Sequence, residues 1–124
     1  MKPVHQCKAL ILDQEPVFEP ILKAMMAGLK WDCEFVASGD AAVAGLKAGR
    51  FDVLIVDYQM RPSNGLHFIC RLRQEGIMVP AILMSNDPQT LRLTPQEMLS
   101  IPAVLLKPFT AVDLNYALWT ALAE

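Results

Sequence analysis

Five polar residues of this chain have types that suit phosphoryl chemistry. They follow or end four short apolar runs, and in chain order they are Asp13, Gln14, Asp57, Ser85 and Lys107. An aspartate oxygen can attack a phosphoryl donor and form an acyl phosphate when a metal, an ammonium and a hydroxyl neutralise the charge on the phosphoryl oxygens. Clustered oxygen ligands suit Mg²⁺, which prefers carboxylates and water and is completed by phosphate oxygens. The set therefore indicates an aspartyl-phosphate site, provided that the fold brings the four segments together.

Alternating strands and helices are the elements that would position these residues. Strands are expected in five short apolar segments, separated by stretches with helical spacing: Lys8–Asp13, Asp32–Ser38, Phe51–Asp57, Val79–Ser85 and Pro102–Leu106. Right-handed crossovers make such strands parallel, so their carboxyl ends share one edge of the sheet, where open α/β folds bind ligands. Taken singly, each polar residue could be a helix cap or a solvated loop residue. Their position at four strand ends favours one shared crevice.

Proline and capping patterns predict where the helices begin. The first helix is expected to start near Glu19, because a helix that began earlier would carry Pro20 in its interior. Capping-box patterns at Thr94–Glu97 and Thr110–Asp113 mark two later helix starts, and the last helix should run to Leu122. Prolines near the fourth crossover predict that it is short or broken.

Composition limits the class of protein. The 124 residues, 53% of them hydrophobic, are enough for one core, so one domain is expected over residues 1–124. Eleven Lys and Arg against 13 Asp and Glu give a net charge of −2, which disfavours direct nucleic-acid binding. No signal-peptide pattern or bilayer-length apolar run is present, so we expect a cytoplasmic protein without membrane contact. Cys7, Cys33 and Cys70 lack CxxC spacing and are expected to be buried free thiols.

Four motifs resemble the receiver domain of bacterial two-component response regulators, and the resemblance covers the whole chain. They are LILDQEP (Leu10–Pro16), DYQMRPSNG (Asp57–Gly65), PAILMS (Pro80–Ser85) and LLKPF (Leu105–Phe109). The Lys107–Pro108 pair after an apolar strand is the most specific feature. The resemblance implies a flavodoxin-like α/β fold, with a five-stranded parallel sheet in the order 2-1-3-4-5 and helices on both faces.

The resemblance also implies roles for individual residues. Asp57 would accept a phosphoryl group from a histidine kinase or a histidine phosphotransfer protein, and Lys107 and Ser85 would contact that group. Mg²⁺ would be held by two carboxylates, a side-chain amide and a backbone carbonyl, supplied respectively by Asp13 and Asp57, by Gln14 and by Gln59. The signal would pass to an unidentified downstream protein by protein–protein contact, and the only chemistry would be self-phosphorylation and self-dephosphorylation.

Three positions depart from the family pattern. The family usually has two acids after the first strand, whereas here Gln14 follows Asp13, so one negative charge is lost and Mg²⁺ should bind weakly. Asn86 is larger than the usual residue and should narrow the approach to Asp57. Val104 replaces an aromatic that moves inward on activation in many relatives, so that relay should be missing.

The last helix has an apolar stripe opposite its core face. The core face is expected to contain Leu114, Ala117, Leu118, Ala121 and Leu122. Val112, Tyr116 and Trp119 fall on the other side, where a solvated helix would carry charges. This stripe could be a partner surface or a homodimer contact. Alternatively, it consists of ordinary surface aromatics, one of them half-buried by a tilt of the helix.

Two other functions remain open. One is a degenerate receiver that binds partners without being phosphorylated, which Gln14 supports. The other is a haloacid-dehalogenase-like phosphohydrolase, in which Asp13 would be the nucleophile and Glu15 the second acid, although the rest of that motif and a cap domain are missing. Met1 and the lack of a linker after the last helix lead us to expect a stand-alone regulator.

Overall fold

The computed structural model of the chain describes residues 6–91, 93–96, 101 and 103–123. Within this part, the strands form one parallel sheet in the order β2-β1-β3-β4-β5, as predicted. The strands are β1 (Lys8–Leu12), β2 (Asp32–Val36), β3 (Val53–Asp57), β4 (Ala81–Ser85) and β5 (Ala103–Leu106). Each lies inside its expected segment, and β1 to β4 are each shorter than expected by one or two residues at one end.

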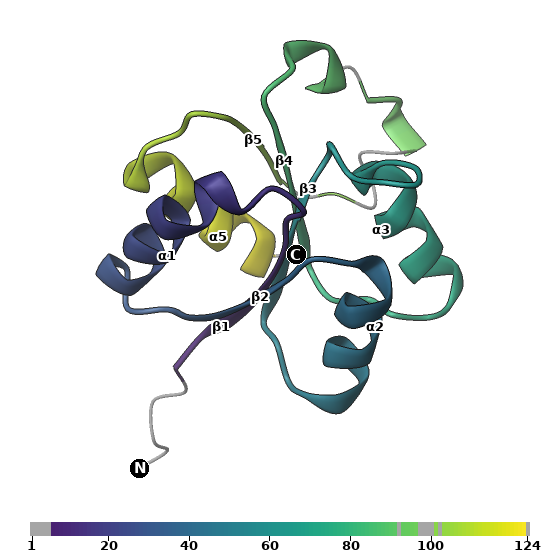
Figure 1. The fold of residues 1–124 in the computed structure, drawn as a ribbon, viewed down its shortest axis with the longest axis horizontal. Coiled ribbons are helices and arrows are strands. Elements are labelled where there is room, and N and C mark those ends of the chain that lie inside the picture. The colour runs from purple at the N-terminus through teal and green to yellow at the C-terminus, as the bar shows by residue number, and fades with distance from the viewer. Residues whose placement is uncertain (1–5, 92, 97–100, 102, 124) are drawn as a thin grey trace.

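Two layers of helices cover the sheet, α1 and α5 on one face and α2 and α3 on the other (Figure 1). The side chains of β1 show how one strand serves both layers. Ala9 and Ile11 pack with residues of α1 and α5, while Leu10 and Leu12 pack with residues of α2 and α3. This alternation is the two-residue period of a strand buried on both faces. The central strands β3 and β4 are buried at every position, which explains their continuous apolar sequences.

A side chain caps the start of α2, α3 and α5, whereas α1 begins without such a cap. The helices are α1 (Glu19–Gly28), α2 (Gly39–Ala48), α3 (Gly65–Gln74) and α5 (Ala111–Leu122). A 3-10 turn over Pro16–Phe18 precedes α1, which confirms the predicted start at Glu19. Thr110 caps α5 through a capping box with Asp113, again as predicted.

The fourth crossover is only partly described. It opens with a 3-10 turn over Pro88–Leu91, and Pro95 and Gln96 are helical. The helix start predicted at Thr94–Glu97 agrees as far as residue 96, and Glu97 lies outside the described residues. Pro102, the expected first residue of the last strand, also lies outside them.

Gly65 fixes the loop that follows β3. A Cβ at Gly65 would overlap the backbone oxygen of Asp57, so only glycine allows this close approach. The backbone N–H of Gly65 also donates to the carbonyl of Tyr58 at 2.9 Å, which closes the loop against the strand end. Within the described residues, the Arg61–Pro62 and Lys107–Pro108 peptide bonds are cis.

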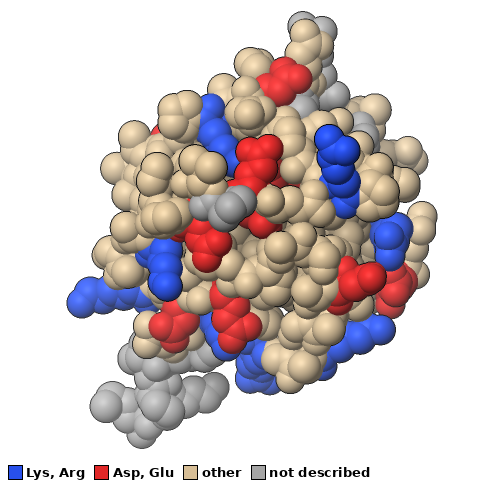
Figure 2. Space-filling view, viewed as in Figure 1, with Lys and Arg blue, Asp and Glu red and all other residues tan. Residues whose placement is uncertain are grey.

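Charged side chains of both signs lie on the surface. On the face drawn in Figure 2, basic and acidic side chains are interspersed, with no continuous basic patch.

All three cysteines are free, as expected, but they are half-buried rather than buried. No helix in the described part of the chain has the length and apolar character needed to span a bilayer.

Candidate functional site

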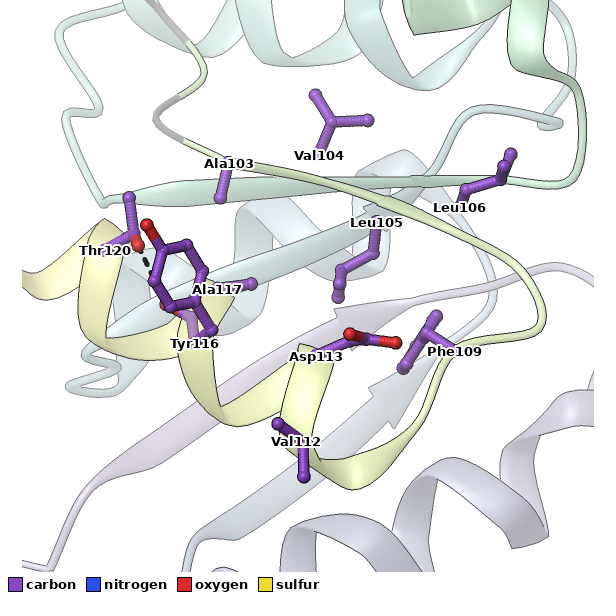
Figure 3. Close-up of a pocket in the computed structure, with 10 residues that line it drawn as sticks. All are labelled: Ala103, Val104, Leu105, Leu106, Phe109, Val112, Asp113, Tyr116, Ala117 and Thr120. Carbon is purple, nitrogen blue, oxygen red and sulfur yellow. Dashed lines mark hydrogen bonds between the residues drawn. The ribbon is translucent and has the colours of Figure 1, made fainter.

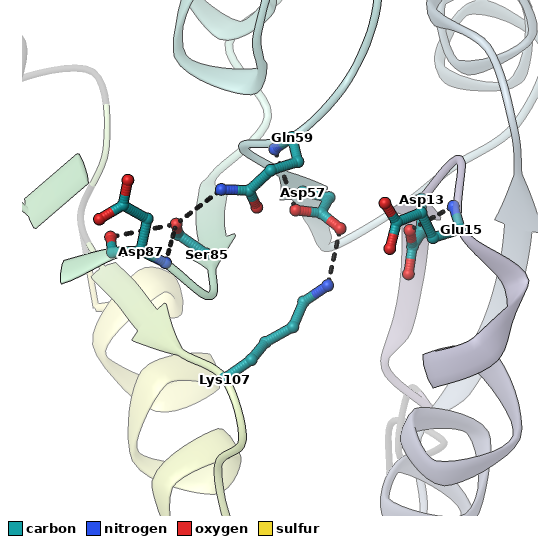
Figure 4. Close-up of polar contacts among 7 residues, drawn as sticks. All are labelled: Asp13, Glu15, Asp57, Gln59, Ser85, Asp87 and Lys107. Carbon is teal, nitrogen blue, oxygen red and sulfur yellow. Dashed lines mark hydrogen bonds and ion pairs between the residues drawn. The ribbon is translucent and has the colours of Figure 1, made fainter. Parts of the chain in front are cut away.

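The carboxyl ends of β1, β3, β4 and β5 lie at one edge of the sheet, and a buried ion pair lies there (Figure 4). Asp57 ends β3 and is 1% exposed. The ammonium of Lys107, one residue beyond β5, lies 2.7 Å from Asp57 Oδ2, and its side chain is 14% exposed. The other carboxylate oxygen, Asp57 Oδ1, accepts the backbone N–H of Gln59 at 3.1 Å. Both oxygens of this carboxylate are therefore held.

Ser85, at the end of β4, is fully buried beside this pair. Its hydroxyl accepts from the side-chain amide of Gln59 at 3.3 Å and from the backbone N–H of Asp87 at 3.0 Å, and it donates to the Asp87 carbonyl at 3.3 Å. The backbone of Lys107 is tied to the same strand end, because its N–H donates to the Ser85 carbonyl at 2.6 Å. Gln59 thus links the hydroxyl to the carboxylate of Asp57.

Asp13 supplies a second carboxylate at this edge of the sheet. Its Oδ1 accepts the backbone N–H of Glu15 at 2.9 Å, while Oδ2 is buried without a hydrogen-bond partner. Burial raises the pKa of Asp13, and the nearby charge of Asp57 adds to this, against the hydrogen bond from Glu15 and the attraction of Lys107. A buried carboxylate oxygen without a partner, next to a second carboxylate, suits a cation.

The donor set fits Mg²⁺ with two carboxylates. Among the described residues no group of three or more His, Cys, Asp and Glu side chains could hold a metal ion. Asp13 and Asp57 would therefore need neutral oxygens and water as the remaining ligands, which Mg²⁺ accepts.

Gln14, expected to be a weak ligand, has both polar atoms of its side chain bonded to the main chain of Arg61. Its Oε1 accepts the Arg61 N–H at 2.7 Å, and its Nε2 donates to the Arg61 carbonyl at 3.1 Å. The side chain therefore lies against the β3–α3 loop.

An aromatic pair beside Lys107 was not predicted from the sequence. The Lys107 ammonium lies 5.1 Å from the centre of the Phe18 ring, and Phe18 packs edge-on against Phe109 with ring centres 5.3 Å apart. A cation over an aromatic face is attracted by the ring quadrupole. Phe109 stood in the LLKPF motif, but nothing in the sequence indicated that Phe18 would lie near the lysine.

The stripe on α5 is exposed, as its helical spacing predicted. Val112 and Tyr116 are each 77% exposed and Trp119 is 58% exposed, while the expected core face is buried except for half-buried Leu122. Val112 and Tyr116 line a groove of about 610 Å³ between α5 and β5 (Figure 3). Trp119 lines a different hollow, together with Trp31 and Cys7. The stripe is thus a ridge between two hollows.

Comparison with known proteins identifies relatives of the chain. The family model of the response regulator receiver domain matches residues 9–118. The transcriptional regulatory protein BasR of Escherichia coli K12 is 29% identical over 96 residues, which are 77% of this chain and 42% of BasR. Regulator of RpoS, also from E. coli K12, is 28% identical over 114 residues, covering 92% of this chain and 33% of that protein. The chain spans less than half the length of these curated relatives.

Solved structures show the same fold. The response regulator TrrA of Thermotoga maritima, in complex with Mg²⁺ and BeF, has a TM-score of 0.81 at 20% identity and covers 94% of this chain and 100% of its own. The chemotaxis response regulator CheY4 of Vibrio cholerae has a TM-score of 0.79 at 23% identity, covering 95% of this chain and 100% of its own.

Proposed function

The chain belongs to the response regulator receiver family, and from that premise we propose that Asp57 accepts a phosphoryl group from a histidine kinase or a histidine phosphotransfer protein. Receiver domains are signalling modules of two-component systems rather than classical enzymes, and phosphorylation and Mg²⁺ binding are typical of the family. The observation that carries the proposal is the buried Asp57 carboxylate, held at 2.7 Å by the Lys107 ammonium at the carboxyl edge of the sheet.

The groups around Asp57 suit an acyl-phosphate reaction. A carboxylate oxygen would form the bond to phosphorus while the bond from phosphorus to the donor nitrogen breaks, and the histidine of the donor keeps that electron pair. Lys107 would oppose the charge on the transferred oxygens. Ser85 would hydrogen-bond to one of them after exchanging its contacts with Gln59 and Asp87.

Four residues would hold Mg²⁺, with unequal contributions. Asp13 and Asp57 would supply carboxylates, and Gln59 would supply its backbone carbonyl. Gln14 would be a weak fourth ligand, because its Oε1 would bind the ion while it also accepts the Arg61 N–H. The partnerless Asp13 Oδ2 supports this assignment, as does the relative TrrA, solved with Mg²⁺ and BeF. When bound, the ion cancels negative charge on the phosphoryl oxygens.

The exposed surface of α5 supports a protein partner for the output of the signal. Val112, Tyr116 and Trp119 form the exposed ridge, and the groove beside Tyr116 would seat an apolar side chain of a downstream protein or of a second copy of the chain. Interfaces commonly centre on exposed aromatic residues of this kind.

A phosphorylation-independent binding module is the second candidate. It is favoured by Gln14, whose amide is satisfied by Arg61 without a metal, and by a site with only two carboxylates. The haloacid-dehalogenase-like alternative gains no support, because the Glu15 side chain is exposed and the family match is to receivers.

Intact-mass analysis after incubation with a small phosphoryl donor, with and without Mg²⁺, separates the two candidates. The native chain should gain a phosphoryl adduct that depends on Mg²⁺, and Asp57→Asn should gain none. Gln14→Asp should gain the adduct at lower Mg²⁺, because it restores a charge opposite the cation. If only Gln14→Asp becomes phosphorylated, the native chain is a phosphorylation-independent module.

A further inference from the structure

The side chain of Gln14 forms a two-point bridge between the loop after β1 and the loop after β3. Its Oε1 accepts the Arg61 N–H at 2.7 Å and its Nε2 donates to the Arg61 carbonyl at 3.1 Å. Because it needs an acceptor and a donor at once, the bridge suits a primary amide. A carboxylate could only accept and an ammonium could only donate. Glutamine at position 14 is therefore chemically matched to the main chain it faces.

The bridged segment begins at the proposed phospho-acceptor. Arg61 is four residues after Asp57, and the intervening Gln59 donates its backbone N–H to Asp57 Oδ1 at 3.1 Å and its side-chain amide to Ser85 at 3.3 Å. The loop is closed at its far end by the hydrogen bond from Gly65 to Tyr58. A displacement of Arg61 would thus be transmitted through Gln59 to the carboxylate and to the hydroxyl.

We propose that Gln14 is a positioning residue, whose amide clasps the Arg61 backbone and so sets the geometry of Asp57, Gln59 and Ser85 without a metal. With a second acid at this position, the loop would instead face a negative charge that needs a cation. With Gln14, two neutral hydrogen bonds hold the loop instead of a bound cation. Its effect on phosphorylation rests on the function proposed for Asp57, whereas the clasp itself can be measured without any phosphoryl donor.

Backbone amide exchange tests the clasp in metal-free solution. Gln14→Met keeps the length of the side chain and removes both hydrogen bonds. Gln74→Met is the matched control, since Gln74 is exposed on α3 and has no side-chain hydrogen bond among the described residues. The Arg61 N–H should exchange about fivefold faster in Gln14→Met, as the loss of one hydrogen bond predicts, and the Gln59 N–H should also accelerate. Gln74→Met should leave both rates unchanged.

Equal exchange of the Arg61 N–H in the native chain and in Gln14→Met, with circular dichroism showing both folded, would refute the clasp. Acceleration at Arg61 without any at Gln59 would refute the positioning role, because the displacement would not reach Asp57.

The phosphoryl readout then distinguishes the two proposals. With saturating donor and Mg²⁺, Gln14→Met should form the Asp57 adduct at a lower maximal rate than the native chain, and Gln74→Met at the native rate. Gln14→Glu should recover the native rate at this saturating Mg²⁺ concentration, because its carboxylate supplies a metal ligand in place of the clasp. If the Arg61 N–H of the native chain is protected from exchange but the native chain forms no adduct, the clasp is supported and the proposed function is refuted.

Discussion

Replacing Lys107 by methionine should destabilise the fold because it leaves the Asp57 carboxylate buried without its counter-ion. Removing one partner of a fully buried ion pair costs about 3–5 kcal/mol. Lys107 is 14% exposed, and the Gln59 N–H still donates to the carboxylate at 3.1 Å, so the low end applies. We therefore expect Lys107→Met to lower the free energy of unfolding by about 3 kcal/mol.

Lys8 provides a matched control in the same sheet. Its ammonium also contacts a carboxylate, Glu34 at 3.1 Å, and an aromatic ring, Phe51 at 5.0 Å from the ring centre. The difference is exposure, since the side chains of Lys8 and Glu34 are 37% and 55% exposed. Exposed pairs contribute about 0.2–1 kcal/mol, so Lys8→Met should cost less than about 1 kcal/mol.

Urea unfolding with linear extrapolation measures both effects, and a double-mutant cycle isolates the pair. The cycle compares Lys107→Met, Asp57→Asn and the double variant with the native chain. Because the double variant removes both charges of the Asp57–Lys107 pair, its loss should be smaller than the sum of the single losses by about 2 kcal/mol. Single losses that add to within about 0.5 kcal/mol would refute the ion pair as the interaction that holds Lys107.

Three further predictions follow from other parts of the structure. Gly65→Ala should lower the free energy of unfolding by about 2 kcal/mol in chemical denaturation, because the added Cβ would overlap the Asp57 backbone. Gly28→Ala is the control and should not destabilise α1, since a Cβ there would meet nothing within 4 Å. Equal losses in the two variants would contradict this. Burial raises the pKa of Cys33, so less thiolate is present at a given pH. Alkylation of Cys33 near pH 8, followed by mass spectrometry, should therefore be slower than alkylation of an exposed peptide thiol and should become faster as the pH rises. An equal rate for the two thiols would contradict this prediction. Trp119→Ser should abolish self-association or partner binding through α5, whereas unchanged sedimentation and unchanged partner binding would argue against that surface.

The sequence predicted the sheet and the convergence of the site because both depend on local pattern. Short apolar runs that alternate with helically spaced stretches favour parallel strands, and the polar residues that end such strands then share an edge. The strand order itself was implied by the family resemblance. The starts of α1 and α5 could also be predicted from the sequence. Pro20 excludes an earlier start for α1, and Thr110 with Asp113 forms a capping box at the start of α5.

Contacts between separate loops could not be predicted in this way. The Gln14–Arg61 bridge joins residues 47 positions apart, and its hydrogen bonds depend on how two irregular loops approach each other. The position of Phe18 over Lys107 likewise depends on the turn before α1 and the loop before α5. The stripe on α5 was visible from helical spacing, but its division between two hollows depends on the neighbouring elements.

Locating the phosphoryl group within the chain tests the central claim most directly. The native chain would be incubated with a small phosphoryl donor and Mg²⁺, the acyl phosphate reduced with borohydride, and the modified peptide sequenced by mass spectrometry. Reduction converts an aspartyl phosphate to homoserine, so the account predicts homoserine at position 57 alone and none in Asp57→Asn. Homoserine at Asp13, or at no position, would contradict the assignment of Asp57 as the phospho-acceptor.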